Sequence, residues 1–337
     1  MPRMKRIKVA QFGLGPIGIE SLKLAAQQPW LEVVGAVDID PAKIGRPLTE
    51  ITGLGQLDGL KVTRDLEALF RESPPEVILH TASSSAAATL AQMRPALEFG
   101  VSVASTCEQL IFPALKVPEL TKEYDALCRH TGARVTATGV NPGFVMDVLP
   151  IALTGVSRSV DGIFVERVVD ASTRRQPLQA KIGSGQDAAE FRAKLQAGRA
   201  GHAGLLESAA LVAHAMGWKL DSLTEVAEPV LAEREIVTPY FNVPAGRVCG
   251  IHQRAVGVCA GIERVVLDIA MYLGAPQPHD RVIVRGRPAL DVVVHGGVAG
   301  DDATVAALVN VVPRLVAAAP GLRLATELPL PKWSANS

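Results

Sequence analysis

The 337-residue chain is poor in the residues on which several classes of protein depend. Its four cysteines form no Cys-x-x-Cys pair and have no histidines at zinc-ligand spacing, so the sequence predicts no structural zinc site. Aromatic residues make up 4% of the chain, which is thin for a surface that stacks bases or sugars. The formal net charge is zero, so the basic footprint of a nucleic-acid-binding or membrane-surface protein is missing.

Export and membrane signals are missing as well. The basic N-terminal residues lead into a strand pattern instead of the apolar core of a signal peptide, and no apolar run reaches the roughly 18–20 residues of a membrane span. We therefore expect a cytoplasmic protein with reduced thiols at Cys107, Cys128, Cys249 and Cys259. No G-x-S-x-G, Walker A or H-E-x-x-H motif is present, and we expect no metal, nucleic acid or membrane partner.

What is present is a glycine-rich turn between two apolar runs of strand length, 7–12 and 33–37. Gly13, Gly15 and Gly18 have the G-x-G-x-x-G spacing of a dinucleotide site. The first permits a tight turn, the second lets the backbone approach a pyrophosphate, and the third lets the helix pack close to the strand. The start of that helix offers free N–H groups to the phosphates. A glycine turn without a ligand is the alternative. We expect cofactor contacts from Gly13, Leu14, Gly15, Pro16, Ile17 and Gly18.

Asp38 follows Gly18 by 20 residues and ends the second strand pattern. A carboxylate at this place holds the hydroxyls of the adenosine ribose. It favours NAD as the cofactor, because it would repel the 2′-phosphate of NADP. Lys43 or Arg46 could still reach that phosphate, so NADP stays open.

Strand and helix patterns continue to alternate up to residue 142. Expected strands at 76–81, 101–104 and 134–138 are separated by helices at 86–99 and around 125–129, and Asp65 is the expected N-cap of a shorter helix. Such repeated units predict an α/β fold with a Rossmann-type, doubly wound parallel sheet. Ligands bind beyond the carboxyl ends of its strands. The residues expected at those ends, and so in one crevice, are Gly13, Asp38, Ala82, Ser83, Ser84, Thr106, Cys107 and Glu108.

Beyond Asn-Pro-Gly at 141–143 the runs become longer and richer in β-forming residues. They predict a C-terminal α+β domain with a largely antiparallel sheet, with helices on one face and the other face free to pair with a second subunit in a homodimer. We place a dinucleotide-binding domain at 1–142 and a substrate-binding and dimerisation domain at 143–302, with a return of the chain to the first domain at about 303–330. The expected strands lie at 162–169, 225–236, 247–258, 263–272, 281–284 and 290–295, and the expected helices at 188–196, 204–215 and 305–319, the last one broken or kinked by Pro313.

Glu108 is the first candidate for catalysis. It ends a strand on the cofactor side and precedes an apolar Leu-Ile-Phe run, an environment that suits a carboxylate which shuttles protons near neutral pH. An acid that merely interacts with a helix dipole is the alternative. The adjacent Cys107 suggests a thiohemiacetal mechanism, but a buried core thiol is the favoured interpretation.

Several polar residues have both a functional and a structural interpretation. Asn141 could orient the nicotinamide carboxamide or simply belong to a hinge rich in glycine and proline. Arg174 and Arg175 could bind a substrate carboxylate or could be ordinary surface charges. His202, between glycines, and His252 could reach the crevice or could be structural histidines.

Together these segments resemble the family of 2,4-diaminopentanoate dehydrogenases and native amine dehydrogenases, which has a dihydrodipicolinate-reductase-like N-terminal domain. The resemblance runs over nearly the whole chain and implies that Glu108 is the catalytic acid/base. Family members often carry a second acid where this chain has Gln109, and the paired-histidine motif of dihydrodipicolinate reductase itself is missing. The matching segments are 12–18, 105–108, 139–147, 170–175, 181–183, 201–202 with 207–208, and 319–322.

The resemblance implies an NAD(P)H-dependent amine dehydrogenase that aminates a ketone or aldehyde with ammonia by hydride transfer to an imine or iminium. The small residues Val140 and Val145 would leave room for bulky carbonyl compounds if they line the pocket. One alternative is a dehydrogenase of 2,4-diaminopentanoate or a related amino acid; another is a non-catalytic dinucleotide-binding protein. The expected substrate-binding residues are Val140, Val145, Thr173, Arg174, His202 and His252.

Overall fold

The computed structural model describes residues 6–334, which form two compact units. The first consists of 6–143 together with 299–334, and the second is Phe144–Val298. Each unit has its own sheet.

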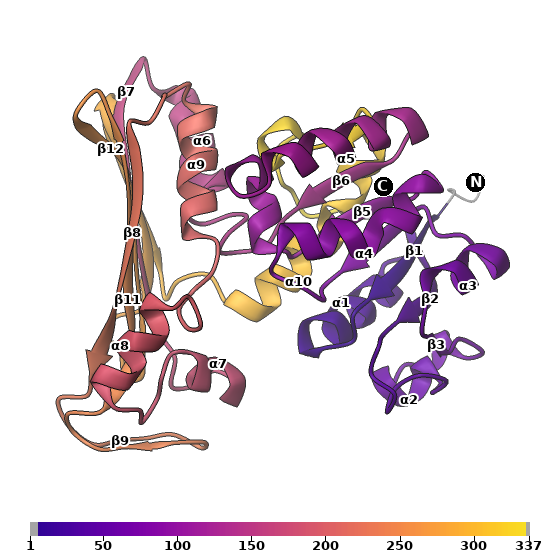
Figure 1. Ribbon diagram of the computed structural model, residues 1–337, viewed down its shortest axis with the longest axis horizontal. Coiled ribbons are helices and arrows are strands. Elements are labelled where there is room, and N and C mark those ends of the chain that lie inside the picture. Colours follow the sequence, from indigo (N-terminus) through magenta and orange to yellow (C-terminus); the bar gives the residue numbers. More distant parts are fainter. Residues whose placement is uncertain (1–5, 335–337) are drawn as a thin grey trace. The chain divides into compact units, whose positions relative to one another are not determined.

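The first unit is built on a seven-stranded sheet with the order β15-β6-β5-β4-β1-β2-β3, in which all paired strands run parallel. This is the predicted doubly wound Rossmann-type sheet (Figure 1). Its strands are β1 (Ile7–Phe12), β2 (Leu31–Val37), β3 (Val62–Thr63), β4 (Val77–His80), β5 (Ser102–Ser105), β6 (Arg134–Ala137) and β15 (Gly321–Leu322).

Helices cover both faces of this sheet. Buried residues of α1, α10 and α11 form one apolar core with β1 and β4, while α3, α4 and α5 contact one another in sequence. The predicted N-cap is confirmed, because the side chain of Asp65 accepts the N–H of Ala68 at the start of α3. The helices are α1 (Pro16–Gln27), α2 (Leu48–Thr52), α3 (Leu66–Glu72), α4 (Ala86–Glu98), α5 (Pro118–Thr131), α10 (Gly300–Asn310) and α11 (Val312–Ala317).

The second unit holds a six-stranded sheet with the order β14-β13-β7-β12-β11-β8. Strands β7 and β12 run parallel and the other neighbours run antiparallel, so the sheet is largely antiparallel, as predicted. A short hairpin joins β9 (Ile236–Val237) to β10 (Asn242–Val243). The sheet strands are β7 (Ser159–Asp170), β8 (Ser222–Leu231), β11 (Val248–Cys259), β12 (Ile262–Tyr272), β13 (His279–Arg287) and β14 (Leu290–His295).

Helices α6 (Val148–Leu153), α8 (Ala188–Gln196) and α9 (Leu205–Ala215) pack on one face of this sheet (Figure 1). Along β11 the residues toward these helices are buried, whereas His252 and Arg254 on the alternate side are exposed. We call the side without helices the outward face. No element of the second unit covers it among the described residues. A further short helix, α7 (Gln176–Lys181), follows β7 in the chain.

Two sequence-based boundaries were wrong. The strand expected to reach residue 236 ends at Leu231, and Ile236 belongs to the β9–β10 hairpin. The helix expected at 305–319 begins earlier, at Gly300; its predicted break near Pro313 is confirmed, because the helix is interrupted at Val311. Proline has no N–H and its ring clashes with the preceding turn, which explains why the helix restarts there instead of continuing. Near the end of the described residues, the N–H of Ser334 donates to the side-chain oxygen of Asn310.

Candidate functional site

The glycine turn after β1 has the geometry that its sequence predicted. Gly13 adopts a positive φ of 88° and its N–H donates to the carbonyl of Val37 at 2.9 Å. A Cβ on Gly18 would overlap the carbonyl oxygen of Gly13, so the helix packs against the turn as closely as only glycine allows. A Cβ on Gly15, in contrast, would meet nothing within 4 Å. The backbone at Gly15 is therefore open to a ligand.

Helix α1 starts immediately after this opening. Gly15 is its N-cap and provides no side-chain hydrogen bond, and Pro16 occupies the first turn. The N–H groups of Ile17 and Gly18 belong to the first turn, which has no carbonyl partners within its own helix. An open glycine and uncapped N–H groups fit a pyrophosphate, so the donor set suits a dinucleotide.

Asp38 directly follows β2, beside the same turn. One of its oxygens, Oδ2, accepts the N–H of Leu14 at 2.7 Å and the ammonium of Lys43 at 3.3 Å, and Oδ1 accepts the N–H of Asp40 at 2.8 Å. Burial alone would raise the pKa of Asp38, but the hydrogen bonds from Asp40 and Leu14 and the nearby Lys43 outweigh it and keep this pKa below its ordinary value. Asp38 is therefore ionised, and part of its bonding capacity already fixes the glycine turn.

The turns after β4 and β5 are tied to each other and to the glycine turn. The hydroxyl of Thr81 donates to the carbonyl of Gly13 at 2.9 Å. The amide oxygen of Gln109 accepts the N–H of Ala86, in the first turn of α4, at 3.0 Å, and the N–H of Gln109 donates to the carbonyl of Ser84 at 3.4 Å. The carboxyl-terminal edge of the sheet thus brings together Gly13, Leu14, Gly15, Pro16, Ile17, Gly18, Asp38, Ala82, Ser83, Ser84, Thr106, Cys107 and Glu108.

Glu108 is the first residue of the short helix η2 (Glu108–Ile111) and is half-buried. Its carboxylate makes no hydrogen bond or ion pair within the range 6–334. Next to it, the fully buried Cys107 thiol has a raised pKa, first because of burial and also because of the charge of Glu108. Raising this pKa keeps the thiol protonated and poorly nucleophilic. The chemistry available at this edge is that of the carboxylate.

Asn141 lies at the end of the first unit, before a cis peptide bond to Pro142. Both polar atoms of its side-chain amide are buried, and neither has a hydrogen-bond partner in the part of the chain that the structure describes. An unsatisfied buried polar group costs about 1–3 kcal/mol, so such an amide suits a ligand that carries a donor and an acceptor of its own. A carboxamide is such a ligand.

The predicted substrate residues are distributed over both units. Val140 belongs to the first unit, and the buried Val145 to the second. Thr173 is exposed, while Arg174, Arg175 and His202 are half-buried.

His202 and His252 do not lie on the same side of the second sheet. The backbone of His202 is held by Gln253, which points from β11 toward the helices: His202 N–H donates to Oε1 at 2.8 Å, and Nε2 donates to the His202 carbonyl at 2.7 Å. His252 points to the outward face, where its Nε2 lies 2.7 Å from Asp268. The structure therefore does not bring these two histidines together.

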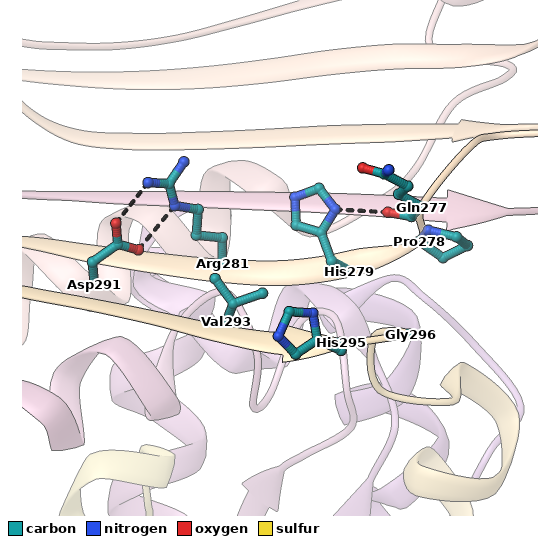
Figure 2. Close-up of a pocket in the computed structure, with 8 residues that line it drawn as sticks. All are labelled: Gln277, Pro278, His279, Arg281, Asp291, Val293, His295 and Gly296. Atoms are coloured by element: carbon teal, nitrogen blue, oxygen red, sulfur yellow. Dashed lines mark hydrogen bonds and ion pairs between the residues drawn. The ribbon is translucent and has the colours of Figure 1, made fainter.

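The outward face carries an open cavity of about 930 Å³ over β13 and β14. Arg281 is paired with Asp291, and Nδ1 of His279 donates to the carbonyl of Gln277 at 2.8 Å. Figure 2 shows both interactions. None of the predicted site residues lines this cavity.

Sequence reasoning missed several residues that hold the site. Gln253 and Gln109 both bond the backbone of another segment, and no local pattern announces such a contact. Asp147 follows the hinge and is fully buried; it accepts the N–H of Val148 and the hydroxyl of Ser208, from α9, at 2.7 Å. Asp147 and Ser208 both lie in segments that the family resemblance singled out, and that resemblance was the available signal for them. No group of three or more His, Cys, Asp or Glu side chains that could hold a metal occurs among residues 6–334. Within that same range, no helix combines the length and the apolar character needed to cross a bilayer.

Comparisons with known proteins agree on one family. The family model of the 2,4-diaminopentanoate dehydrogenase C-terminal domain matches residues 144–337. The 2,4-diaminopentanoate dehydrogenase of Acetoanaerobium sticklandii is 30% identical over 98% of this chain and 95% of its own. An amine dehydrogenase of Streptomyces virginiae is 26% identical over 96% of each chain. The fold matches that of an amine dehydrogenase from Mycobacterium smegmatis with a TM-score of 0.84, at 22% identity and 99% coverage of both chains.

Proposed function

The chain belongs to the 2,4-diaminopentanoate dehydrogenase family, and on that premise we propose that it is an NAD(P)H-dependent amine dehydrogenase. It would interconvert a ketone or aldehyde plus ammonia with the corresponding primary amine. The observation that carries the proposal is Glu108, a half-buried carboxylate at the carboxyl-terminal edge of a dinucleotide-type sheet, whose oxygens have no partner among the described residues.

The cofactor would lie along the turn from Gly13 to Gly18, with its pyrophosphate at the N–H groups of Ile17 and Gly18. A reduced nicotinamide supplies a hydride when it is bound. The buried amide of Asn141 would hold its carboxamide, because donor and acceptor both need a partner. Further cofactor contacts would come from Leu14, Gly15, Pro16, Asp38, Ala82, Ser83, Ser84, Thr106 and Cys107.

The ionised Asp38 favours NAD, since it would repel a 2′-phosphate. Lys43, 3.3 Å from Asp38, offsets part of that charge and leaves use of NADP open. Lys43→Ala should therefore lower kcat/KM for NADPH more than for NADH. Equal losses for both cofactors would remove Lys43 from cofactor selection.

Glu108 would handle the protons of amination. Its carboxylate takes a proton from ammonium, so that ammonia can attack the carbonyl carbon and form the C–N bond of a carbinolamine. It then gives a proton to the carbinolamine hydroxyl, which leaves as water, and its negative charge stabilises the resulting iminium. Val140, Val145, Thr173, Arg174 and His202 are the proposed substrate contacts; His252 is not among them, because it faces the other side of the sheet.

A carboxylated substrate is the second candidate. The family includes enzymes named for 2,4-diaminopentanoate, and the half-buried Arg174 is of the right type to bind a carboxylate. Comparing a diamino acid with a simple amine of similar length distinguishes the two. Arg174→Ala should raise KM for the diamino acid and leave KM for the simple amine nearly unchanged.

The direct test is oxidation of NADH and NADPH with a panel of ketones and aldehydes, with and without ammonium. The proposal predicts oxidation that requires both the carbonyl compound and ammonium. Oxidation without ammonium would instead indicate an alcohol-forming reductase. Cofactor binding without turnover on any carbonyl compound or diamino acid would favour a non-catalytic dinucleotide-binding protein.

We further propose that a second copy of the chain covers the outward face in a homodimer. The polar side chains of this face are largely bonded to one another, as in Arg281–Asp291 and His252–Asp268. The strand register places apolar residues in one row across four strands: Ile283, Phe164, Val266 and Val256. Phe164→Glu should convert the dimer to a 35.5 kDa monomer in sedimentation, whereas Val156→Glu, at an exposed position in η4 (Thr154–Val156), should not. A wild-type monomer would refute this proposal.

The four cysteines are free, which suits the reducing cytoplasm that we propose as the location of the protein.

A further inference from the structure

The segment before Glu108 rests on a buried hydrogen-bonded chain that no sequence motif indicated. His80, the last residue of β4, is fully buried and lies between the last residues of the two neighbouring strands. Its ring stacks on that of Phe12 at 5.3 Å between centroids. Its Nδ1 lies 3.0 Å from the hydroxyl of Ser105, and its Nε2 lies 3.0 Å from the amide oxygen of Gln92 on α4.

The direction of each hydrogen bond in this series follows from the charge state of His80 and from the Gln92 oxygen at one end. Burial lowers the pKa of His80 to about 4, so the imidazole is neutral at pH 7. The Gln92 oxygen can only accept, which places the proton on Nε2 and makes Nδ1 an acceptor. The Ser105 hydroxyl must then donate to Nδ1, and its oxygen accepts the N–H of Cys107 at 3.0 Å.

Hydrogen bonds hold the backbone on both sides of Glu108. The carbonyl of His80 accepts the N–H of Thr106 at 3.0 Å, and Ser105 accepts that of Cys107. On the far side, Gln109 is bonded to Ser84 and Ala86. Hydrogen bonds thus hold the segment at residues 106, 107 and 109, while the carboxylate of Glu108 has no partner in the described part of the molecule.

We infer that His80 and Ser105 are positioning residues for Glu108: the imidazole orients the serine hydroxyl, the hydroxyl oxygen fixes the Cys107 amide, and the fixed amide sets where the carboxylate points. The inference rests on the proposed function, because it concerns the group that we propose as the acid/base. Neither residue would touch the substrate or the cofactor. A displacement of about 1 Å can cost on the order of 10²-fold in rate, which is why such a support matters.

The strand that carries Ser105 also provides a matched control. Ser102, at the other end of β5, is also buried, and its hydroxyl oxygen accepts the N–H of Arg134 at 3.2 Å. Ser105→Ala should lower kcat roughly ten- to hundredfold and leave the cofactor Kd unchanged. Ser105→Thr, which keeps the hydroxyl, should retain most of the wild-type kcat. Ser102→Ala should leave kcat unchanged despite a similar loss of Tm. Equal effects of Ser105→Ala and Ser102→Ala on kcat would overturn the inference.

A double-mutant cycle separates this inference from the proposed function. In a Glu108→Gln background, Ser105→Ala should lower kcat no further, because the group that it positions is already gone. An undiminished effect of Ser105→Ala in that background would show that Ser105 acts independently of Glu108 and would overturn the inference. If Glu108→Gln itself retains wild-type kcat, the proposed acid/base assignment fails instead.

The tautomer of His80 gives a readout that does not depend on activity. Nitrogen-15 NMR of the wild-type protein at pH 7 should show a neutral ring protonated on Nε2. Gln92→Met, on the exposed side of α4, removes the acceptor and should shift the proton toward Nδ1, with a severalfold lower kcat. A cationic ring, or one protonated on Nδ1 in the wild type, would contradict the inferred direction of the chain.

Discussion

Around Glu108 the hydrogen bonds are made by neighbouring residues and not by the carboxylate itself. Its place at a strand end was predictable, because the carboxyl ends of parallel strands meet at one edge. The supports were not predictable: Gln109 looked like a departure from a family pattern, yet its amide oxygen caps the first turn of α4. His80 gave no signal either, because its partners come from a neighbouring strand and from a helix. Side-chain contacts of this kind depend on how segments distant in sequence come together.

The buried His80 should make the stability of the protein depend on pH. Its pKa is about 4 when folded and 6.5 in the unfolded chain, so the unfolded state binds more protons between these values. The contribution of the neutral His80 to the free energy of unfolding is fully present above pH 6.5 and is lost as the pH falls toward 4. Over the whole window it amounts to about 3 kcal/mol. Urea unfolding at pH 7, 6 and 5 measures it. The free energy of unfolding should fall more steeply for the wild type than for His80→Asn, and parallel curves would contradict the assignment.

At the scale of elements, the strand–turn–helix unit of 7–27 was the most predictable part of the chain. Glycine spacing, the apolar run before it and the acid after it constrain one another, and the structure forms β1 and α1 accordingly. The extent of the helix near the C-terminus was less predictable. Pro313 correctly predicted an interruption, but the sequence pattern did not reveal that the helix already begins at Gly300. Such a helix start depends on packing against α1, which has no local sequence signal.

Two glycines of this unit should respond differently to the same substitution. Gly15→Ala places a methyl group in open space, so Tm should be unchanged while cofactor Kd rises about tenfold, equivalent to 1.4 kcal/mol. The new Cβ of Gly18→Ala would clash with the carbonyl of Gly13 and would lie 2.7 Å from the Thr81 hydroxyl oxygen. It should lower stability by about 1–3 kcal/mol. Thermal unfolding and cofactor titration of both variants check this, and an unchanged Kd for Gly15→Ala would remove that glycine from the cofactor site.

At the scale of the whole molecule, the chain leaves the first unit after Gly143 and returns to it at Ala299. The composition change after Asn141 indicated the first of these crossings, and the α/β pattern before it predicted the parallel sheet. What the sequence could not predict was the buried ion pair before the second crossing. Arg167 on β7 and Asp280 on β13 form two hydrogen bonds of 2.7 and 2.8 Å. They also hold the carbonyl and the N–H of Val298, the last residue of the second unit.

This ion pair should be essential for stability in a way that a surface pair is not. Asp280→Asn leaves a buried guanidinium without its countercharge and should cost about 3–5 kcal/mol. Asp291→Asn, which breaks the exposed pair with Arg281, should cost about 0–1 kcal/mol. Urea unfolding of the two variants compares them directly. Equal losses would show that the Arg167–Asp280 pair does not anchor the second unit.

The central claim is that one carboxylate performs the proton chemistry of amination, and its most direct test is the kcat of Glu108→Gln with the best carbonyl substrate and saturating ammonium. Glu119→Gln, an exposed carboxylate on α5, serves as the matched control. The account predicts that Glu108→Gln lowers kcat by about 10²–10⁴-fold with an unchanged cofactor Kd, and that Glu119→Gln has no effect. A Glu108→Gln variant that turns over at the wild-type rate would contradict the account.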